Sequence, residues 1–163
     1  MGVERVSRLD VQIRRLMAQR AFLERAAALA EPLSGPAIQL GFGDGSAFDH
    51  LRDILRRRAL IVFDRILPEG DRAPPADARV PGDLHDTLPV AWDRFPRSVA
   101  LLHINFPVTS TPHLVAELAP LAAPLLGPGA FIVSEIAVQL PGWQVQPPPD
   151  GVREGRHYLY RAG

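Results

Sequence analysis

The sequence predicts a doubly wound α/β fold, with a mostly parallel sheet and helices on both faces. Three observations lead to this prediction. Short apolar runs alternate along the chain with segments whose apolar residues recur every three or four positions. The run 99–104 is apolar at nearly every position, as is typical of a strand covered on both faces. A glycine-rich turn joins the first run to the next helical segment.

Length and composition favour one globular domain. We expect residues 1–163 to form it, since a chain of this length can bury a single core. The formal net charge of zero gives nucleic-acid binding no support. Cysteine is absent, which excludes disulfides, thiolate nucleophiles and cysteine-ligated metals. No run approaches the roughly 20 apolar residues of a membrane span, so a soluble, cytoplasmic protein without a membrane partner is the default expectation.

An N-terminal helix is predicted over residues 7–30, within an N-terminal segment 1–31. Ser7 and Asp10 form a capping pattern at its start. Its apolar residues recur at helical spacing and form one stripe: Val6, Leu9, Ile13, Leu16, Leu23 and Ala27. The arginines beside this stripe are expected to face solvent, although such a helix could also cover a binding cleft.

A strand–helix–strand unit follows. Residues 37–40 are predicted to form a strand, 48–58 a helix and 59–63 a second strand that ends in Asp64. This unit of about 30 residues is typical of a parallel βαβ crossover.

The remaining elements continue the alternation as far as residue 134. Residues 79–80 form a weak third strand, followed by a short helix around 86–92 and the strand 99–104. A helix over 112–126 is expected to end at Gly127-Pro128-Gly129, before a fifth strand over 130–133. Residues 37–134 therefore form the core, and 135–163 a C-terminal loop and closing strand (156–161), expected at the sheet edge.

The glycine turn is the first candidate site. Gly41, Gly43 and Gly45 lie between a strand and a helix, where ligands bind in such sheets. Glycine permits a sharp turn and a close ligand approach, although topology alone could also require the turn. Asp64 ends the next strand 19 residues after Gly45 and is placed to accept two hydrogen bonds from a ribose diol.

Two cofactor classes use this layout. A dinucleotide fingerprint, G-x-G-x-x-G, would need glycine at Ser46, which disfavours an NAD-dependent oxidoreductase. The spacing G-x-G-x-G instead resembles the first motif of class I methyltransferases that use S-adenosylmethionine (SAM). Further motifs resemble this family in the same order: Asp64 after the second strand, Gly82-Asp83-Leu84 after the third, and 126–133 entering the fifth.

The resemblance covers about residues 37–134 and implies a Rossmann-like class I methyltransferase core. The whole sequence also resembles a small bacterial family of S-adenosyl-L-methionine methyltransferases, through the segments 6–10, 49–52 and 62–65. This resemblance implies that SAM is the cofactor and that a methyl group is transferred to an unidentified acceptor. The implied cofactor-binding residues are Gln39, Gly41, Phe42, Gly43, Gly45, Asp64, Arg65, Asp83 and Leu84. Gln39 stands where the family usually has an acid.

His103 and Asn105 are the catalytic candidates, because they end the central strand and share one face of it. His103 could act as a general base, or could be a buried histidine bonded to backbone. The other histidines have no metal-ligand spacing, so no metal is predicted.

The acceptor is expected to be small or bound at the interface of a homo-oligomer. The N-terminal helix and residues 135–157 are its candidate walls. The alternative is a SAM-binding or vestigial domain without turnover, which Gln39 and Asn105 favour.

Overall fold

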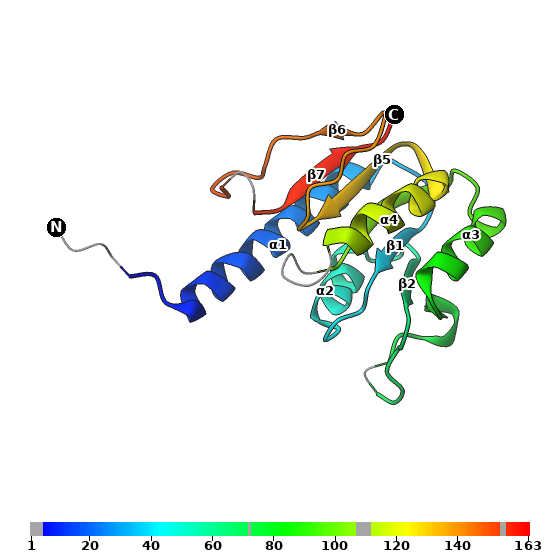
Figure 1. Ribbon diagram of the computed structural model, residues 1–163, viewed down its shortest axis with the longest axis horizontal. Helices are drawn as coiled ribbons and strands as arrows, with labels where there is room; N and C mark the ends of the chain where they lie inside the picture. Colours follow the sequence, from blue (N-terminus) through cyan, green and yellow to red (C-terminus); the bar gives the residue numbers. More distant parts are fainter. Residues whose placement is uncertain (1–4, 72, 107–111, 154–155) are drawn as a thin grey trace.

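The computed structural model describes residues 5–163 apart from 72, 107–111 and 154–155 (Figure 1). The strands are β1 (Ala37–Leu40), β2 (Leu60–Asp64), β3 (Arg79–Pro81), β4 (Val99–Ile104), β5 (Leu126–Ser134), β6 (Gln144–Val145) and β7 (Tyr158–Arg161). The helices are α1 (Arg8–Ala30), α2 (Ser46–Leu55), α3 (Leu84–Arg94) and α4 (Pro112–Ala122), with 3-10 turns η1 (Ala76–Ala78) and η2 (Ala123–Leu125).

One sheet contains all these strands in the order β3-β2-β1-β4-β5-β7-β6. The first five are parallel, and β7 runs antiparallel to both β5 and β6. The predicted doubly wound, mostly parallel sheet is therefore confirmed. The strand order reverses between β1 and β4, and ligands bind outside the carboxyl ends of strands at such a switch point.

Helices cover both faces of the sheet. Side chains of α1 and α2, among them Phe22 and Leu51, pack with Leu101, Val133 and Leu159 on one face. Side chains of α3 and α4 form the core on the other face with residues such as Ile38, Leu102 and Ile132. Because both faces are covered, β1 and β4 are buried at every position, which explains why their residues other than Gln39 and His103 are apolar.

Two strand predictions need correction. β5 begins at Leu126 rather than at 130, because Gly127-Pro128-Gly129 continues the strand. Its pairing with β4 shifts register between Val99 and Leu101, which lets these residues stay in the sheet. The closing strand forms as β7, but β6 lies outside it at the edge. A two-residue strand such as β6 is too short to give a sequence pattern.

The predicted capping of α1 is confirmed, since Ser7 and Asp10 form a reciprocal capping box. The predicted apolar stripe, however, divides into two parts. Leu23 is buried, whereas Leu9, Ile13 and Leu16 are exposed, because the first half of α1 extends beyond the sheet (Figure 1). Among the described residues, no helix is both long and apolar enough to cross a membrane.

Candidate functional site

The glycine loop, residues 41–45, connects the carboxyl end of β1 to α2. Gly41, Gly43 and Gly45 have φ angles of +88°, +59° and +86°, a region in which side chains are strained. Gly45 is also the N-cap residue of α2. The path of the loop therefore depends on glycine at three alternate positions.

The surroundings of the three glycines differ. A Cβ at Gly41 would lie 2.9 Å from the carbonyl oxygen of Asn105, and one at Gly45 would lie 2.8 Å from the ring of Phe42. Among the described residues, a Cβ at Gly43 would meet only Nδ2 of Asn105, at 3.5 Å. Packing thus requires glycine at positions 41 and 45, whereas the loop is open beside Gly43.

Asp64 at the end of β2 holds the loop in place. Its Oδ2 accepts a hydrogen bond from the backbone N–H of Phe42 at 2.7 Å, and its Oδ1 accepts one from that of Arg65 at 2.6 Å. The ring of Phe42 is buried against Phe48, with 5.7 Å between ring centroids. Phe42 therefore contributes its backbone to this edge, while its side chain belongs to the core.

A second carboxylate lies on the neighbouring segment. The N–H of Gly82 donates to the carbonyl of Asp64 at 3.0 Å, and Asp83 next to it caps α3 by accepting from the N–H of His85 at 2.9 Å. The hydrogen bond from His85 lowers the pKa of Asp83, and the charge of Arg65 adds to this effect. Two carboxylates and one arginine thus gather at the ends of β2 and β3.

Leu84 is also a predicted cofactor-binding residue, but it differs from Asp64, Arg65 and Asp83. Its side chain is buried in the core on the α3 and α4 face. Its side chain therefore packs in the core beneath the ends of β2 and β3 and does not lie at the surface of the site.

Gln39 and His103 lie side by side on β1 and β4, and both are buried. Nε2 of Gln39 donates to the carbonyl of Gly41 at 2.9 Å, and its Oε1 lies 3.1 Å from Nδ1 of His103. Because that oxygen can only accept, Nδ1 of His103 carries the proton. Burial, with a smaller effect of His157, lowers the pKa of His103 to about 3, so its imidazole is neutral. The pair supports the loop from below.

Asn105, the other catalytic candidate, contacts the loop directly. Its Nδ2 donates to the carbonyl of Gly41 at 3.1 Å, and its Oδ1 accepts from Nε2 of Gln19 on α1 at 3.1 Å. Its side chain is also the neighbour of the open position at Gly43. Asn105 therefore links α1, β4 and the glycine loop.

Three residues at this edge were not predicted individually. Nε of Arg15 donates to Oε1 of Glu135 at 2.7 Å, although 120 positions separate them. His157 is buried, and neither of its ring nitrogens has a hydrogen-bond partner in the described residues. Burial lowers its pKa to about 4, although Glu135 opposes this shift.

The predicted acceptor walls meet here, since α1 supplies Arg15 and the segment 135–157 supplies both Glu135 and His157. Residues 154–155 of that segment lie outside the described residues. No local pattern could have identified the three, because only the pairing of β5 with β7 and the crossing of α1 bring them together.

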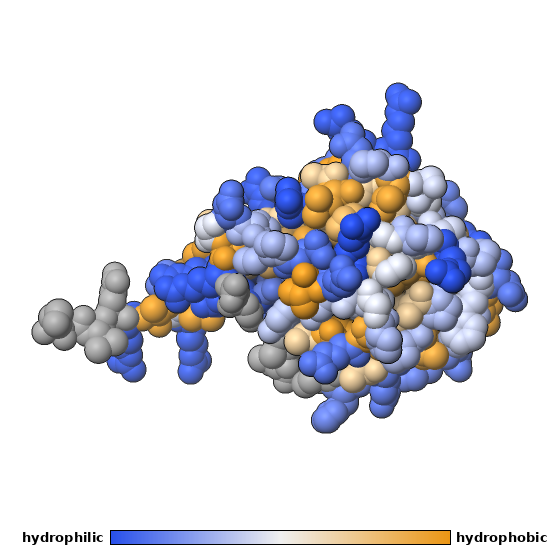
Figure 2. Space-filling view, turned by 90° about the horizontal axis from the view of Figure 1, so that it is seen from above, coloured by the Kyte–Doolittle hydropathy of each residue, from blue (hydrophilic) through white to orange (hydrophobic). Residues whose placement is uncertain are grey.

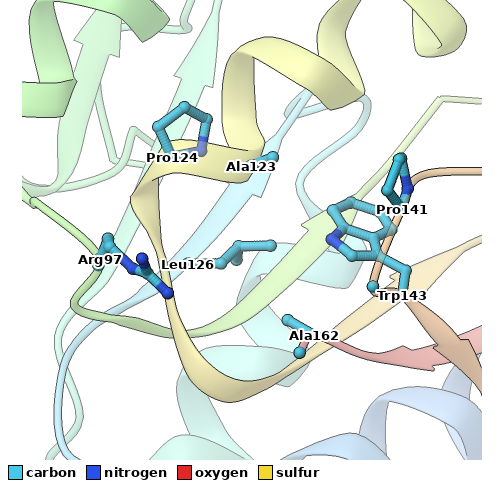
Figure 3. A pocket seen from close by; sticks show the side chains of 9 residues that line it. Arg97, Ala123, Pro124, Leu126, Pro141, Trp143 and Ala162 are labelled. Atoms are coloured by element: carbon cyan, nitrogen blue, oxygen red, sulfur yellow. The ribbon is translucent and has the colours of Figure 1, made fainter.

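A separate cavity of about 500 Å³ lies at the opposite edge of the sheet (Figure 3). Leu126 at the start of β5, Ala162 after β7 and Trp143 line part of it. The ring of Trp143 packs on Tyr160, with 6.0 Å between centroids. Because the parallel strands begin at this edge, the cavity is not part of the candidate site.

Comparisons with known proteins agree with the fold. The model of a family described as S-adenosyl-L-methionine methyltransferase matches residues 6–162. A crystal structure of an S-adenosyl-L-methionine methyl transferase from Silicibacter pomeroyi DSS-3 is 34% identical, covers 96% of this chain and 99% of that chain, and has a TM-score of 0.89.

More distant structures share the fold alone. The antibiotic-resistance methyltransferase Kmr is 16% identical over 88% of this chain and 92% of its own, with a TM-score of 0.53. The O-methyltransferase TomG from Streptomyces achromogenes, solved in complex with SAM, is 16% identical over 82% and 73%, with a TM-score of 0.50. No protein of curated function matches the sequence.

Proposed function

Since this chain belongs to the family of S-adenosyl-L-methionine methyltransferases, we propose that its glycine loop and the adjoining ends of β2 and β3 hold SAM while a methyl group passes to a small acceptor. Residues 1–163 act as one domain in this proposal. The bound cofactor supplies a methyl group already activated on a sulfonium, and the protein aligns the acceptor with it.

The observation that carries this proposal is the combination of an open position at Gly43 with the carboxylate of Asp64 beside it. Within the part of the chain that the structure describes, Gly43 has no close neighbour other than Asn105, which leaves room there for the methionine part of the cofactor. Asp64 is engaged by two backbone N–H groups, yet each carboxylate oxygen can accept further hydrogen bonds. We assign to it the ribose hydroxyls.

The other predicted residues divide into two groups. Asp83 would accept from the adenine amino group, with Arg65 beside it. The supporting group lies beneath the contact surface and fixes its shape: Gln39, Gly41, Phe42, Gly45 and Leu84. The burial of Gln39 and the core position of the Phe42 ring support this division.

For the chemical step, we assign alignment to Asn105 and support to His103. Asn105 borders the open position at Gly43 and can orient a polar group there. His103 is neutral and buried, with its Nδ1 proton engaged by Gln39, which argues against proton exchange with an acceptor. Loss of His103 should therefore act through the position of the loop.

The acceptor would enter between α1 and the segment 135–157. Arg15, Glu135 and His157 supply polar groups on that side. We propose a small molecule as the acceptor. The bacterial origin of the similar structure supports a location in the bacterial cytoplasm.

Titration of an Asp64→Ala variant with SAM and S-adenosylhomocysteine tests the cofactor site. Loss of a charged hydrogen-bond acceptor costs about 1.5–3 kcal/mol, which corresponds to a dissociation constant roughly 10- to 150-fold weaker. Isothermal titration calorimetry measures this change. Asp53→Ala, which removes an exposed carboxylate on α2, is the matched control and should bind like the parent protein. A change below about twofold for Asp64→Ala would place the ribose elsewhere.

A further inference from the structure

Exposed apolar side chains gather on the first half of α1. Of the ten large apolar side chains that are exposed in the described residues, six lie between positions 6 and 17. Four of them form a surface that we call the α1 stripe: Leu9 (65% exposed), Ile13 (44%), Leu16 (47%) and Met17 (65%). Figure 2 shows apolar atoms on this projecting part of the molecule.

Most of the α1 stripe points away from the sheet, although Met17 at its end borders a cavity together with Val152 and Arg153. At about 100° per residue, its four side chains occupy a sector of about 100° around the helix axis. That sector is centred roughly 130° away from the mean direction of the side chains that α1 buries, which are Ala18, Phe22, Leu23, Ala26 and Ala30. In proteins, helices owe most of their stability to packing of the apolar face, and no described residue packs over most of this surface.

We propose that the α1 stripe is the contact surface of a homodimer, in which two copies of α1 pack antiparallel about a two-fold axis near Ile13. The stripe is self-complementary in this arrangement. Ile13 meets its own equivalent on the axis. Leu9 of each copy meets Met17 of the other, because both lie about one helical turn from Ile13.

The charges beside the stripe fit the same arrangement. Asp10 and Arg14 are one turn apart on one side of the stripe, and a two-fold axis brings the same side of both helices together. Asp10 of each copy therefore faces Arg14 of the other. The hydrogen bond from Ser7 lowers the pKa of Asp10, so its carboxylate is charged. The net charge of zero adds no repulsion between the copies.

A second copy explains the length of the stripe better than a membrane surface does. Arg20 and Glu24 follow on the same side of α1 and pair with each other at 3.0 Å, so the apolar surface ends after Met17. A helix that lies on a membrane keeps its apolar face along its length. In the dimer, the projecting first halves of the two α1 helices, each about 15 Å long, cover each other's apolar surface.

This contact is smaller than a standard interface, so we expect a dissociation constant of about 1–100 µM. The same helix carries Arg15 and Gln19 to Glu135 and Asn105. The second copy would therefore support the helix that borders the candidate site.

Sedimentation equilibrium of the full chain, from about 1 to 500 µM, tests the dimer. The parent protein should dissociate on dilution. Ile13→Glu places two carboxylates on the axis and should weaken the dimer at least about tenfold. Val90→Glu on α3, where the side chain is 76% exposed, is the matched control and should leave the dimer unchanged. Arg14→Glu should also weaken it, whereas Arg25→Glu, outside the overlap, should not.

Three results would overturn the proposal. The first is a parent protein that stays monomeric throughout this concentration range. The second is a dimer that Ile13→Glu and Val90→Glu affect equally while circular dichroism shows both variants folded. The third is a monomer that binds vesicles of phosphatidylglycerol through the α1 stripe. No cofactor is present in these experiments, so their outcome is independent of the SAM titration.

Discussion

The side chain of Gln39 serves as a hydrogen-bond donor and as an acceptor at the same buried position. The resemblance to class I methyltransferases implies an acid at this position, yet the glutamine is buried below the glycine loop. Its amide donates to the carbonyl of Gly41 and accepts from His103. An ionised carboxylate could accept from His103 but could not donate to Gly41. The amide therefore suits a buried position between a carbonyl and an imidazole N–H.

Replacing Gln39 with glutamate should destabilise the protein at pH 7 by about 1–3 kcal/mol, because the carboxylate loses the donor and is buried. Burial raises the folded-state pKa of such a glutamate above its unfolded value. The penalty therefore shrinks as the pH falls toward about 4, where the protonated acid can donate to Gly41. Urea unfolding at pH 7 and pH 5, compared with the parent protein at the same pH, measures the difference. Gln12→Glu on exposed α1 is the control, and equal stability at pH 7 would contradict this interpretation.

At the scale of elements, the glycine loop combines two kinds of glycine that the sequence pattern does not distinguish. Gly45 is held by the ring of Phe42, and Gly41 by the end of β4. Gly43 has the same positive φ region but open surroundings. The G-x-G-x-G spacing therefore serves packing at two positions, and in the proposed function the middle one admits the ligand.

Alanine at Gly43 and alanine at Gly45 should have opposite main effects. Gly43→Ala should cost only about 1–3 kcal/mol of stability, the strain of a left-handed residue, but should weaken SAM binding because its Cβ enters the open position. Gly45→Ala must also displace Phe42 and should lower the melting temperature more. Differential scanning calorimetry and SAM titration of both variants separate the two effects. Unchanged SAM affinity in folded Gly43→Ala would remove the ligand from this side of the loop.

Most elements could be predicted from the sequence because their patterns are local. β1, β2 and β4 are apolar runs, and Ser7 with Asp10 marks the start of α1 to the residue. The wrong predictions concern features that depend on contacts between distant parts of the chain. The start of β5 depends on its register with β4, and the exposure of the α1 stripe depends on where the sheet ends. Neither is encoded within a window of ten or fifteen residues.

Considered as a whole, the molecule buries two histidines on the face that α1 covers. Both His103 and His157 are neutral in the folded state, with pKa values lowered to about 3 and about 4. In the unfolded chain each would titrate near pH 6.5. Between these values the unfolded state binds more protons, so folding stability must decrease as the pH falls.

The stability of the protein should therefore fall between pH 6.5 and pH 4, by up to about 1.4 kcal/mol per pH unit for each histidine. His157→Leu should remove one of the two contributions. It should also raise stability at pH 7, because it removes two buried ring nitrogens that have no hydrogen-bond partner among the described residues. Thermal unfolding from pH 4 to pH 8 tests both effects, with His113→Leu at an exposed site on α4 as control. A slope that His157→Leu leaves unchanged would mean that His157 is protonated or hydrated in the folded state.

Some residues of the candidate site could be predicted from local sequence patterns, and others could not. The positions of Gly41, Asp64 and Asp83 at strand ends follow from a βαβ pattern, and each lies at the expected edge. The contact of Arg15 with Glu135 and the burial of His157 require the full topology. Polar groups that are more than a hundred residues apart in the sequence do not form a short motif, so a sequence pattern cannot identify their contact.

The place of β7 between β5 and β6 also has a consequence for protein synthesis. The outer edge of β5 gains its partner only when Tyr158–Arg161 has been made, 24 residues after Ser134. At about 5–20 residues per second this interval lasts roughly one to five seconds. During that time a growing chain has an apolar strand with unpaired backbone groups, which is the kind of edge that recruits other chains. Crowded translation of this protein should therefore favour aggregation before completion, and chaperones that bind nascent chains should limit it.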